Sequence, residues 1–483
     1  MAHTLRHINF AIVFRVVGWL LGIEALFMLM AAAVGLCYDE SDSFSFLAGA
    51  GITLMAGALL SFGLRRTSRD MGKYEAFLLT ALVWIVFSLF STIPLMLCRQ
   101  PMTFTDAFFE SMSGFTTTGC TVAPSVEALS HTVNFWRCLI EWIGGMGIIL
   151  FTLAVIPMLN HSGGMQMFNA EVTGITHEKL RPRVSQTAKG LWSVYFILTA
   201  ALIGLLCLSP MNLFDSACHA FSTMSTGGFS TFNDSLAHID STYVNVVVLV
   251  FMFLGGTSFA LIYKFLHGDR KPLYKNSVFR VYAGTVVGAY ILIAGTILIT
   301  GQYTGWESVT VDPLFQVISA ISSTGFMVCD IEPWGGFAIA LLFILMFSGA
   351  CAGSTSGGAK IDRMIVLAKY SSNEIYRCLH PNTICSVRLG GKIMSPDVVS
   401  KVIAFICLYM LVMIVGGLLL TAFGMPLLSA FHTSFSCVSN TSYGDGYQLI
   451  PDAGKWCMTL LMLAGRLEIY SILILFSRTF WTK

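Results

Sequence analysis

The sequence predicts an all-α membrane protein with ten transmembrane helices and four shorter re-entrant segments in a pseudo-fourfold arrangement. Of its 483 residues, 55% are hydrophobic and only 11% are charged, whereas a soluble domain carries about 25% charged residues. Apolar runs close to the roughly 20 residues that a spanning helix needs recur along the whole chain. A short segment rich in hydroxyl side chains and glycine occurs four times between such runs.

The apolar runs give the order of the helices. The first, at residues 10–36, is too long for the core of a signal peptide and has no convincing cleavage site, so we expect a retained helix. A run at residues 335–349 is shorter than the others. The remaining runs are residues 46–64, 76–97, 135–158, 191–208, 243–266, 278–299, 398–422 and 458–476.

Charges in the connections predict the topology, because Lys and Arg in short loops stay on the cytoplasmic side. One set of connections is basic, and the intervening ones are acidic, as at residues 37–44, or lack Lys and Arg, as at 301–312. The alternation predicts an even number of spans, two cytoplasmic termini and glycine-rich segments on the outer side. The basic connections are the N-terminus with Arg6, the loop with Arg65, Arg66, Arg69 and Lys73, residues 179–189, the loop with Arg270, Lys271 and Lys275, residues 377–401 and the tail 478–483.

Several functional classes are disfavoured by the composition. The 13 cysteines are scattered without a C-x-x-C pair, which indicates neither a disulfide framework nor a zinc site. No G-x-S-x-G, H-E-x-x-H or paired Asp motif lies at membrane depth, so we do not expect an enzyme. The cytoplasmic connections are too short for a nucleotide-binding domain and contain no G-x-G-x-x-G, and no nucleic-acid partner is expected. Membrane lipid is the expected surroundings, and the basic inner surface could dock anionic lipid or a regulatory subunit.

From about residue 76 onward one plan recurs: a long apolar helix, a short amphipathic segment, a hydroxyl- and glycine-rich stretch, and another apolar helix. Three of the short segments begin with Asp, at positions 106, 215 and 312, where we expect a helix N-cap. A motif glycine follows 12 or 13 residues later, at Gly119, Gly227 and Gly325, and Ser442 takes that place in the fourth copy. The four segments are residues 106–121, 215–231, 312–328 and 429–446.

Each short segment must dip into the bilayer and return, because twelve helical residues span only about 18 Å. Non-helical backbone at membrane depth needs shelter from protein or a water-filled cavity. Four such loops that enter from one side can shelter one another around an axis, with backbone carbonyls converging on it. Carbonyl rings replace the hydration shell of a cation, glycine permits the required backbone, and helix C-termini favour positive charge. A single copy would read as an ordinary Gly/Ser turn, but four aligned copies favour a cation filter.

A second glycine-rich stretch, residues 349–360, interrupts the eighth apolar segment. Each glycine costs about 1 kcal/mol in a helix relative to alanine, and a break at mid-membrane often lines a cavity; close helix contact through small residues is the alternative. Arg466 lies midway along the last apolar run, and Glu468 at i+2 cannot face it on a helix. We therefore expect Arg466 to bind another element, either at a cavity or as a structural contact.

Other polar residues lie inside apolar runs. Lys360 at the end of the glycine-rich stretch could face an inner vestibule or extend its ammonium to the membrane surface. For the rest we expect hydrogen-bonded packing roles, and none of them forms a metal-ligand cluster. They are Glu24, Glu141, His219 and His432.

With these motifs the chain resembles the Trk/Ktr/HKT superfamily of cation transporters, and more narrowly the potassium-translocating membrane subunit of the bacterial Trk system. The resemblance covers almost the whole chain, including two extra N-terminal helices at about 10–37 and 45–64. It implies a pseudo-fourfold pore, homodimerisation, uptake of K⁺ across the bacterial inner membrane, and a cytosolic nucleotide-binding regulatory subunit. It rests on TTTGCT (116–121), STGGFST (225–231), SSTGFMV (322–328), GACAGSTSGGAKIDRM (349–364) and LAGRLEIYSILILFS (463–477).

The resemblance also implies roles for individual residues. Filter carbonyls would come from Thr117, Thr118, Ser225, Thr226, Ser323, Thr324, Asn440 and Thr441, held by Gly119, Gly227 and Gly325. The glycine-rich stretch would be an intramembrane gate under the filter, with Arg466 beside it as an electrostatic barrier. The gate residues would be Gly349, Ala350, Gly353, Ser354, Thr355, Ser356, Gly357, Gly358 and Lys360.

The fourth segment departs from the family pattern, because Ser442 stands where a filter glycine is expected. If that position needs a positive φ, serine costs about 1 kcal/mol or more. Sodium or mixed conduction is therefore an alternative to potassium uptake. A cation-coupled secondary transporter of a small solute is a more remote alternative, and an inverted repeat would favour it.

The chain is expected to divide into five parts. Residues 1–75 form two N-terminal helices, and four pore units follow at residues 76–160, 189–267, 277–378 and 396–483. The second helix of the unit at 277–378 is expected to be broken.

Overall fold

The computed structural model describes residues 8–64, 71–147, 184–269, 271–301, 305–443 and 447–482. Helices account for most of these residues, which confirms the predicted helical class. The described strands form one antiparallel pair of two-residue strands, β1 (Arg388–Leu389) and β2 (Lys392–Ile393). Several features of the sequence lie outside the described residues: Arg6, the arginines of the 65–70 loop, Arg270, residues 148–183 and residues 444–446.

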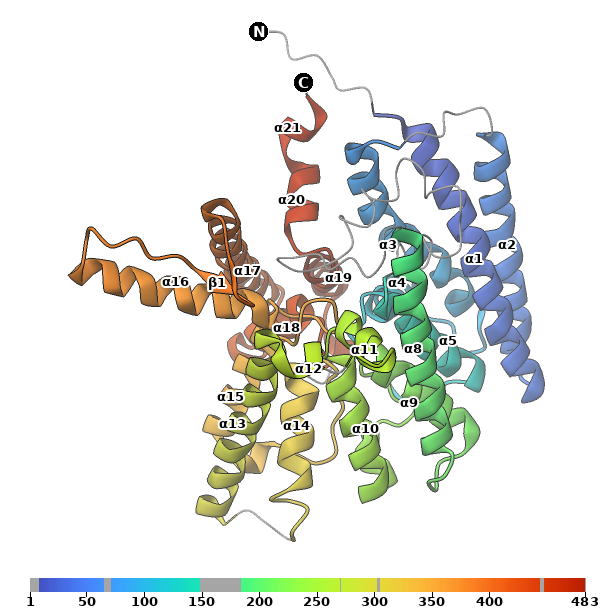
Figure 1. The fold of residues 1–483 in the computed structure, drawn as a ribbon. Coiled ribbons are helices and arrows are strands. Elements are labelled where there is room, and N and C mark those ends of the chain that lie inside the picture. Colours follow the sequence, from blue (N-terminus) through green and yellow to red (C-terminus); the bar gives the residue numbers. More distant parts are fainter. Residues whose placement is uncertain are drawn as a thin grey trace.

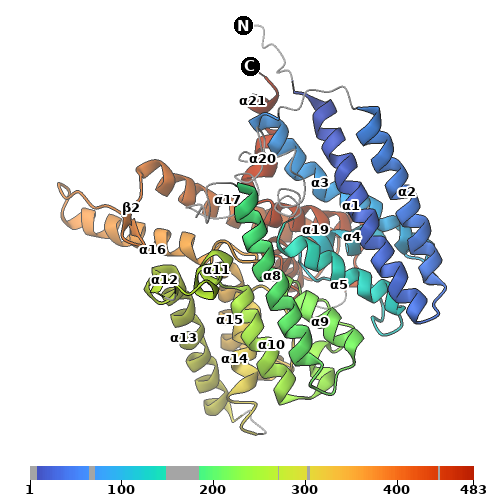
Figure 2. The same ribbon diagram turned by 45° about the vertical axis from the view of Figure 1, so that its right-hand side comes forward.

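The helices follow the expected order (Figures 1 and 2). Two N-terminal helices, α1 (Phe10–Cys37) and α2 (Asp42–Gly63), pack side by side. Gly18 and Gly57 permit this, since a Cβ on Gly57 would lie 2.7 Å from the Gly18 carbonyl oxygen. The others are α3 (Lys73–Leu97), α4 (Phe104–Phe115), α5 (His131–Gly145), α8 (Val184–Leu206), α9 (Leu213–Ser225), α10 (Thr242–Gly255), α11 (Phe259–Leu266), α12 (Lys271–Lys275), α13 (Ser277–Thr300), α14 (Val311–Ile321), α15 (Gly336–Ser348), α16 (Ile361–Leu379), α17 (Pro396–Ala422), α18 (Leu427–Ser439), α19 (Asp452–Arg466), α20 (Tyr470–Phe476) and α21 (Arg478–Trp481).

The short helices α4, α9, α14 and α18 are arranged in a ring. Each packs between the helix before it and the helix after it, as α4 does between α3 and α5. The following helix of each group also packs on the short helix of the next group: α5 on α9, α10 on α14, and α15 on α18. Contact between α19 and α4 closes the circuit. The four groups therefore follow one another in cyclic order.

In the described part of the chain, two of the helices that follow the short ones are bent at a break. Helices α10 and α11 meet at 104°, and α19 and α20 meet at 113°. The uninterrupted runs predicted at 243–266 and 458–476 are therefore wrong, whereas α15 ends at the predicted break. Glycines explain the break sites, because a Cβ on Gly465 would lie 2.1 Å from the Val438 carbonyl oxygen. A side chain there would prevent the helix end from reaching the backbone of α18.

The count of ten spans stays a prediction. Among the described residues, six helices have the length and apolar composition to cross a membrane, and the two bent pairs would raise the number to eight. The runs predicted at 135–158 and 335–349 correspond to α5, with 15 residues, and α15, with 13. The second half of the first of these runs, after Gly147, lies outside the described residues.

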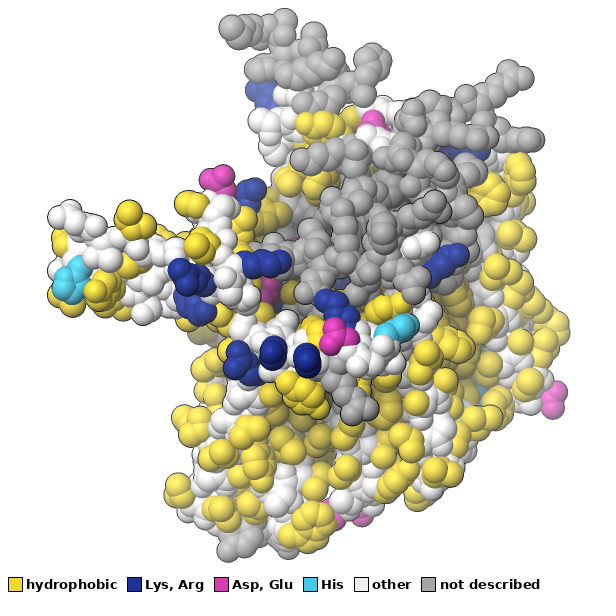
Figure 3. Space-filling model, viewed as in Figure 1, with side chains coloured by type: hydrophobic (Ala, Val, Ile, Leu, Met, Phe, Trp, Pro, Cys, Tyr) yellow, Lys and Arg dark blue, Asp and Glu magenta, His cyan; other side chains and the backbone are white. Residues whose placement is uncertain are grey.

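The molecular surface is that of a multi-pass membrane protein. Figure 3 shows hydrophobic side chains over most of the face below α12 and α16, and Lys and Arg side chains gathered at the level of those two helices. Exposed residues include Ile291 and Ile299 on α13, Lys271 on α12 and Lys369 on α16. Apolar side chains on a helix exterior are stable against lipid.

Both ends of the described chain lie on one side of the molecule. The ring of Phe10 at the start of α1 stacks on Trp481, with centroids 6.5 Å apart. Tyr74 at the start of α3 contacts Phe480 edge-on, with centroids 5.4 Å apart. The first and last helices therefore begin and end at a common face.

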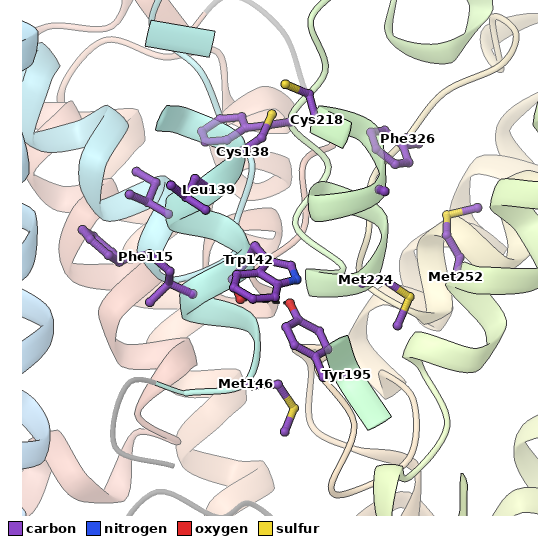
Figure 4. Packing of buried hydrophobic residues seen from close by; sticks show 14 of the residues in the cluster. Phe115, Cys138, Leu139, Trp142, Met146, Tyr195, Cys218, Met224, Met252 and Phe326 are labelled. Atoms are coloured by element: carbon purple, nitrogen blue, oxygen red, sulfur yellow. Dashed lines mark hydrogen bonds between the residues drawn. The ribbon is translucent and has the colours of Figure 1, made fainter. Parts of the chain in front are cut away.

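A buried aromatic cluster fixes α5 against α8 (Figure 4). The Trp142 and Tyr195 rings stack with centroids 5.4 Å apart, and the Tyr195 hydroxyl donates to the Trp142 carbonyl at 2.9 Å. The Trp142 indole N–H donates to the Thr199 hydroxyl at 3.0 Å. These contacts hold the C-terminal end of α5, which carries Gly144 and Gly145, close to the candidate site.

Glu40, between α1 and α2, ties those helices to α5. Its carboxylate accepts from the backbone N–H of His131 at 2.8 Å, and from the N–H and hydroxyl of Thr132 at 3.0 and 2.7 Å. Partial burial raises the pKa of Glu40, but the bonds from Thr132 and His131 outweigh it, so the pKa lies below its ordinary value of 4.5. A lowered carboxyl pKa contributes stability above the unfolded-state pKa, and this contribution is lost as the pH falls through the folded-state value.

We predict that Glu40→Gln lowers the free energy of unfolding at pH 7 by about 1 kcal/mol, the usual cost of losing a helix cap. The loss should shrink as the pH falls below about 4.5, because the carboxyl of the unfolded chain is then protonated, and it should vanish below the lower folded-state pKa. Thermal unfolding in detergent from pH 3.5 to 7 measures this. The adjacent exposed Asp39, changed to Asn, is the control, and equal effects of the two changes would contradict the prediction.

Candidate functional site

The four short helices end in the same backbone motif. At the end of α4 the Thr117 N–H donates to the Gly114 carbonyl and the Thr118 N–H to the Ser113 carbonyl, both at 2.9 Å. This is a Schellman motif, in which the first residue after the helix cap is left-handed. The equivalent left-handed residues are Thr117, Thr226, Ser323 and Asn440, with φ between 51° and 57°. The repeat seen in the sequence is therefore a repeat of backbone conformation.

The backbone corrects the alignment of the second segment by one residue. Gly119 and Gly325 have φ of 74° and 85°, and the glycine with the matching conformation is Gly228, at 93°, rather than Gly227. Gly227 instead matches Thr118 and Thr324, and Ser225 lies one position before the left-handed residue. The spacing contains the signal, since Gly228 follows Asp215 by 13 residues, as Gly119 follows Asp106.

Ser442 does not adopt the conformation of the three glycines. It is absent from the positive-φ residues, so the backbone strain considered for serine at this position does not arise. Its hydroxyl donates to the Gly119 carbonyl at 2.8 Å. The fourth segment therefore differs from the others both in its backbone and in a hydrogen bond to a carbonyl of the first.

The aspartates at the helix starts are not N-caps. Thr103 caps α4 and Asn212 caps α9, each accepting from the backbone N–H of the Asp three residues later, at 3.2 and 2.7 Å. Asp312 lies in the first turn of α14, after its cap residue Thr310. A carboxylate in the first turn still favours the helix electrostatically, and the true caps lie outside the segment boundaries drawn from the sequence.

The four segments meet one another closely. A Cβ on Gly119 would lie 1.9 Å from the Gly227 carbonyl oxygen, and one on Gly228 would lie 2.0 Å from that of Thr324. Gly325 similarly meets the backbone of Ser442, whose hydroxyl returns to Gly119. The contacts run from the first segment through the second, third and fourth and back. The predicted filter residues, 117–119, 225–227, 323–325 and 440–442, are thus brought together and are buried or nearly so.

Side chains on the short helices form hydrogen bonds with the residues that follow these helices. Glu110 of α4 accepts from the Thr121 hydroxyl at 2.9 Å and the Val122 N–H at 3.0 Å. His219 occupies the same position on α9, and its Nε2 lies 2.9 Å from the Ser230 hydroxyl. Gln316, at that position on α14, accepts from the Tyr443 hydroxyl at 2.7 Å. The sequence patterns did not single out Glu110 or Gln316, although each lies four residues after a segment aspartate.

The other buried polar residues behave differently from one another. Glu141 and His219 are hydrogen-bonded as expected. The ring of His432 lies edge-on to that of Phe343, with centroids 4.4 Å apart. Glu24 is 1% exposed, and its carboxylate oxygens have no hydrogen-bond partner among the described residues. The hydrogen bond expected for Glu24 is therefore not found in the described part of the chain.

The loop at 349–360 lies against three of the four segments. The Thr355 hydroxyl donates to the Met224 carbonyl at 3.1 Å, beside the second segment. The Gly357 N–H donates to the Ser323 hydroxyl at 2.5 Å, and the Gly358 N–H to the Ser439 carbonyl at 3.1 Å. The remaining bonds fold the loop on itself and on the neighbouring breaks. They include Cys351 N–H to Gly256, Ile361 N–H to Ala350, Phe259 N–H to Gly353, and the Ser354 hydroxyl to Ser356.

Backbone geometry makes the loop a non-helical structure. Gly349, Gly353 and Gly358 have φ of 63°, 75° and 75°, and Lys360 has φ of 70°. Lys360 is 3% exposed, and its ammonium donates to the carbonyl and hydroxyl of Ser356. Its side chain therefore turns back into the loop and does not extend to the membrane surface.

Arg466 bridges the loop and the first segment. Its guanidinium donates to the Thr117 hydroxyl at 3.2 Å and to the Thr355 carbonyl at 3.4 Å. It also donates to the carbonyls of Gly144 and Gly145 at the end of α5, at 2.5 and 3.0 Å. The expectation that Arg466 binds another element is confirmed, but it is the last residue of α19 and does not lie midway along a continuous helix.

A cavity of about 100 Å³ lies where the loop, the helix breaks and the segments meet. Its walls include Gly145 and Met146 from α5 and its end, Ser356 and Lys360 from the loop, and Asn440, Arg466 and Glu468. Glu468 also pairs with Arg363 at the start of α16, at 2.5 Å. Among the described residues no group of His, Cys, Asp and Glu side chains could hold a metal ion. The four segments instead offer backbone carbonyl and hydroxyl oxygens, which suit a dehydrated monovalent cation.

Comparison with known proteins agrees with this geometry. Residues 42–282 and 289–483 match the model of the TrkH family, described as "Cation transport protein". The chain is 35% identical over 483 residues to the Trk system potassium uptake protein TrkH of Vibrio parahaemolyticus, covering 98% of this chain and 99% of that protein. It is 33% identical to TrkG of Escherichia coli K12, covering 97% of this chain and 98% of that one. The crystal structure of the potassium transporter TrkH from Vibrio parahaemolyticus matches with a TM-score of 0.89 at 32% identity, over 98% of this chain and 100% of that one.

Proposed function

Because this chain belongs to the TrkH family of cation transport proteins, and is not an enzyme, we propose that it takes up potassium ions across the bacterial inner membrane. The observation that carries the proposal is the closed circuit of contacts from Gly119 to Gly227, Gly228 to Thr324, Gly325 to Ser442 and back to Gly119. Four backbone segments that meet in cyclic order can direct carbonyls to one axis, as a cation filter requires. The cyclic order also disfavours an inverted-repeat carrier.

The proposed filter consists of the left-handed residue of each segment and the two residues after it. These are Thr117, Thr118 and Gly119; Thr226, Gly227 and Gly228; Ser323, Thr324 and Gly325; and Asn440, Thr441 and Ser442. Ser225 then lies at the inner end of the second segment. The helix C-termini that precede the filter carry partial negative charge, which favours a cation there.

In this proposal the loop at 349–360 closes the inner side of the filter, and Arg466 holds it closed. Hydrogen bonds from the loop to Met224, Ser323 and Ser439 support a position across the pore axis. The guanidinium of Arg466 repels cations that leave the filter. Opening would require the loop to exchange these bonds for others, because a buried backbone group must stay paired.

The proposed units are those expected from the sequence, residues 76–160, 189–267, 277–378 and 396–483, with residues 1–75 outside the ring. The shared face of Phe10 and Trp481 supports two termini on one side, and the basic band near α12 and α16 supports a cytoplasmic location for that band. The resemblance to the Trk family implies two further proposals. This chain forms a homodimer, and it works with a cytosolic nucleotide-binding regulatory subunit.

Cation flux into proteoliposomes that contain the purified protein tests the proposal. Potassium, rubidium, sodium and lithium are compared at equal gradients, with and without the regulatory subunit and nucleotide. We expect potassium and rubidium to exceed sodium. Comparable sodium flux would favour mixed conduction, for which the Ser442 contact with the Gly119 carbonyl is the supporting observation. No flux of any cation with all components present would contradict the proposal and favour a carrier of another solute.

A further inference from the structure

A carboxylate lies directly behind the second filter segment. Glu141 of α5 is 0% exposed and accepts from the Ser222 hydroxyl at 2.6 Å. Both of its oxygens also lie 3.3 Å from the backbone nitrogen of Phe229, whose N–H they accept. A Cβ on Gly227 would lie 2.4 Å from the carboxylate carbon, so nothing separates this group from the filter backbone.

The bond to Phe229 fixes the direction of a filter carbonyl. In a trans peptide the N–H and the carbonyl point in opposite directions, so an N–H of Phe229 that points at α5 turns the Gly228 carbonyl away from α5. Gly228 has φ of 93°, and glycine has little intrinsic preference for one orientation of this peptide. An external acceptor must therefore set the orientation, and Glu141 is that acceptor.

The other segments are held by different groups at the matching positions. Ser222 corresponds to Ser319 and Ser436 on α14 and α18, and these hydroxyls bind their own segments directly. In the fourth segment the N–H of Tyr443, which corresponds to Phe229, donates to the Ser436 hydroxyl at 3.3 Å. In the second segment Glu141 takes the Ser222 hydroxyl and accepts from the Phe229 N–H itself. The second segment is the only one in which, among the described residues, a carboxylate accepts from the N–H at the position of Phe229.

A neighbouring ion pair keeps the support rigid. Arg137, one turn before Glu141 on α5, pairs with Glu110 at 2.6 Å, and both side chains are at most 1% exposed. The Arg137 guanidinium lies 4.1 Å from the centroid of the Phe229 ring. Residue 229 is thus held through its N–H by Glu141 and through its ring by Arg137. Both come from α5, which belongs to the preceding unit.

We infer that Glu141 is a positioning residue that directs the Gly228 carbonyl toward the ion path and thereby sets the discrimination between potassium and smaller cations. The inference rests on the proposed function. A filter selects potassium only if its carbonyls are held where they replace the hydration shell of that ion. If the carboxylate is moved away, the peptide between residues 228 and 229 can rotate. One of the four carbonyls in that layer of the proposed filter would then no longer point to the ion.

Two conservative substitutions separate positioning from simple packing. Glu141→Gln keeps an acceptor oxygen at the same reach, so we expect its rubidium-to-sodium flux ratio to stay within about twofold of wild type. Glu141→Asp keeps the carboxylate but withdraws it by one methylene, and we expect the ratio to fall by about threefold or more, as for one lost hydrogen bond. The matched controls are Glu24→Gln and Glu24→Asp, because Glu24 is equally buried but lies on α1, outside the ring.

The experiment measures rubidium and sodium flux in proteoliposomes for the full chain, after each variant has given a single gel-filtration peak. A lowered ratio in Glu141→Asp, with retained ratios in Glu141→Gln and in both Glu24 variants, supports the inference. An unchanged ratio in Glu141→Asp overturns it while leaving the proposed function intact. An equal fall in Glu24→Asp also overturns it, because loss of packing would then be the cause. Absence of cation flux in the wild type overturns the proposed function and this inference with it.

Discussion

Arg466→Ala is expected to raise basal cation flux by about ten- to thirtyfold. A unit positive charge about 8 Å from a passing cation opposes it by about 2 kcal/mol at an effective dielectric constant of about 20, which corresponds to about thirtyfold in rate. The substitution also releases the Thr355 carbonyl, which tethers the loop at 349–360. Both effects act in the same direction.

A second substitution distinguishes the charge from the hydrogen bonds. Arg466→Lys keeps the positive charge, but one ammonium cannot reproduce the planar fork that reaches Thr117, Thr355 and the end of α5. If the charge dominates, the lysine variant should conduct close to the wild-type level. If the tether dominates, it should resemble the alanine variant.

Rubidium uptake into proteoliposomes without the regulatory subunit gives the basal flux. Arg478→Ala, which removes an exposed arginine in α21, is the matched control and should leave flux unchanged. Wild-type flux in a folded Arg466→Ala protein would mean that Arg466 is a structural contact between α19 and α5 and does not form part of the gate.

Ser442→Gly is expected to raise the potassium-to-sodium flux ratio by about two- to tenfold. The Ser442 hydroxyl donates a hydrogen bond to the Gly119 carbonyl, which belongs to the proposed filter. A net hydrogen bond is worth about 0.5–1.5 kcal/mol, and about 1.4 kcal/mol corresponds to a tenfold change. Without the hydroxyl, the Gly119 carbonyl is free to coordinate the ion. Glycine at position 442 can also adopt the positive φ of the matching glycines in the other three segments.

Reversal potentials or paired tracer fluxes measure this ratio. Ser386→Gly, in an exposed connection before β1, is the control for the substitution itself. A lower ratio in Ser442→Gly would show that the hydroxyl supports the filter by holding Gly119, and that the serine is a stabilising part of the fourth segment.

The order of the helices and the four short segments could be predicted from the sequence, because both depend on local patterns. Apolar length identifies a spanning helix wherever it lies in the chain. The hydroxyl and glycine stretches at 116–119 and 322–325 end short helices by rules that involve only neighbouring residues. The correct alignment of Gly228 could also have been predicted, from its sequence separation from Asp215.

The breaks at Gly256 and after Arg466 could not be predicted from the apolar pattern. Hydrophobic residues resume after each bend, and the short stretches GGTS (255–258) and GRLE (465–468) do not by themselves distinguish a bend from a continuous span. The cause lies in the short segment of the same unit, since Gly255 approaches the side chain of Thr226 and Gly465 approaches the Val438 carbonyl. The sequence shows these glycines but does not show the groups that they approach.

By itself, the sequence determined the class of the protein, the four-part repeat and its short helices, since hydrophobic length, helix capping and glycine conformation act over a few residues. The tertiary structure decided which groups meet. Arg466 binds Thr117, 349 residues away, and Glu141 supports Phe229, 88 residues away. Cyclic packing of the units creates these contacts, and the properties proposed for the filter and its gate depend on them.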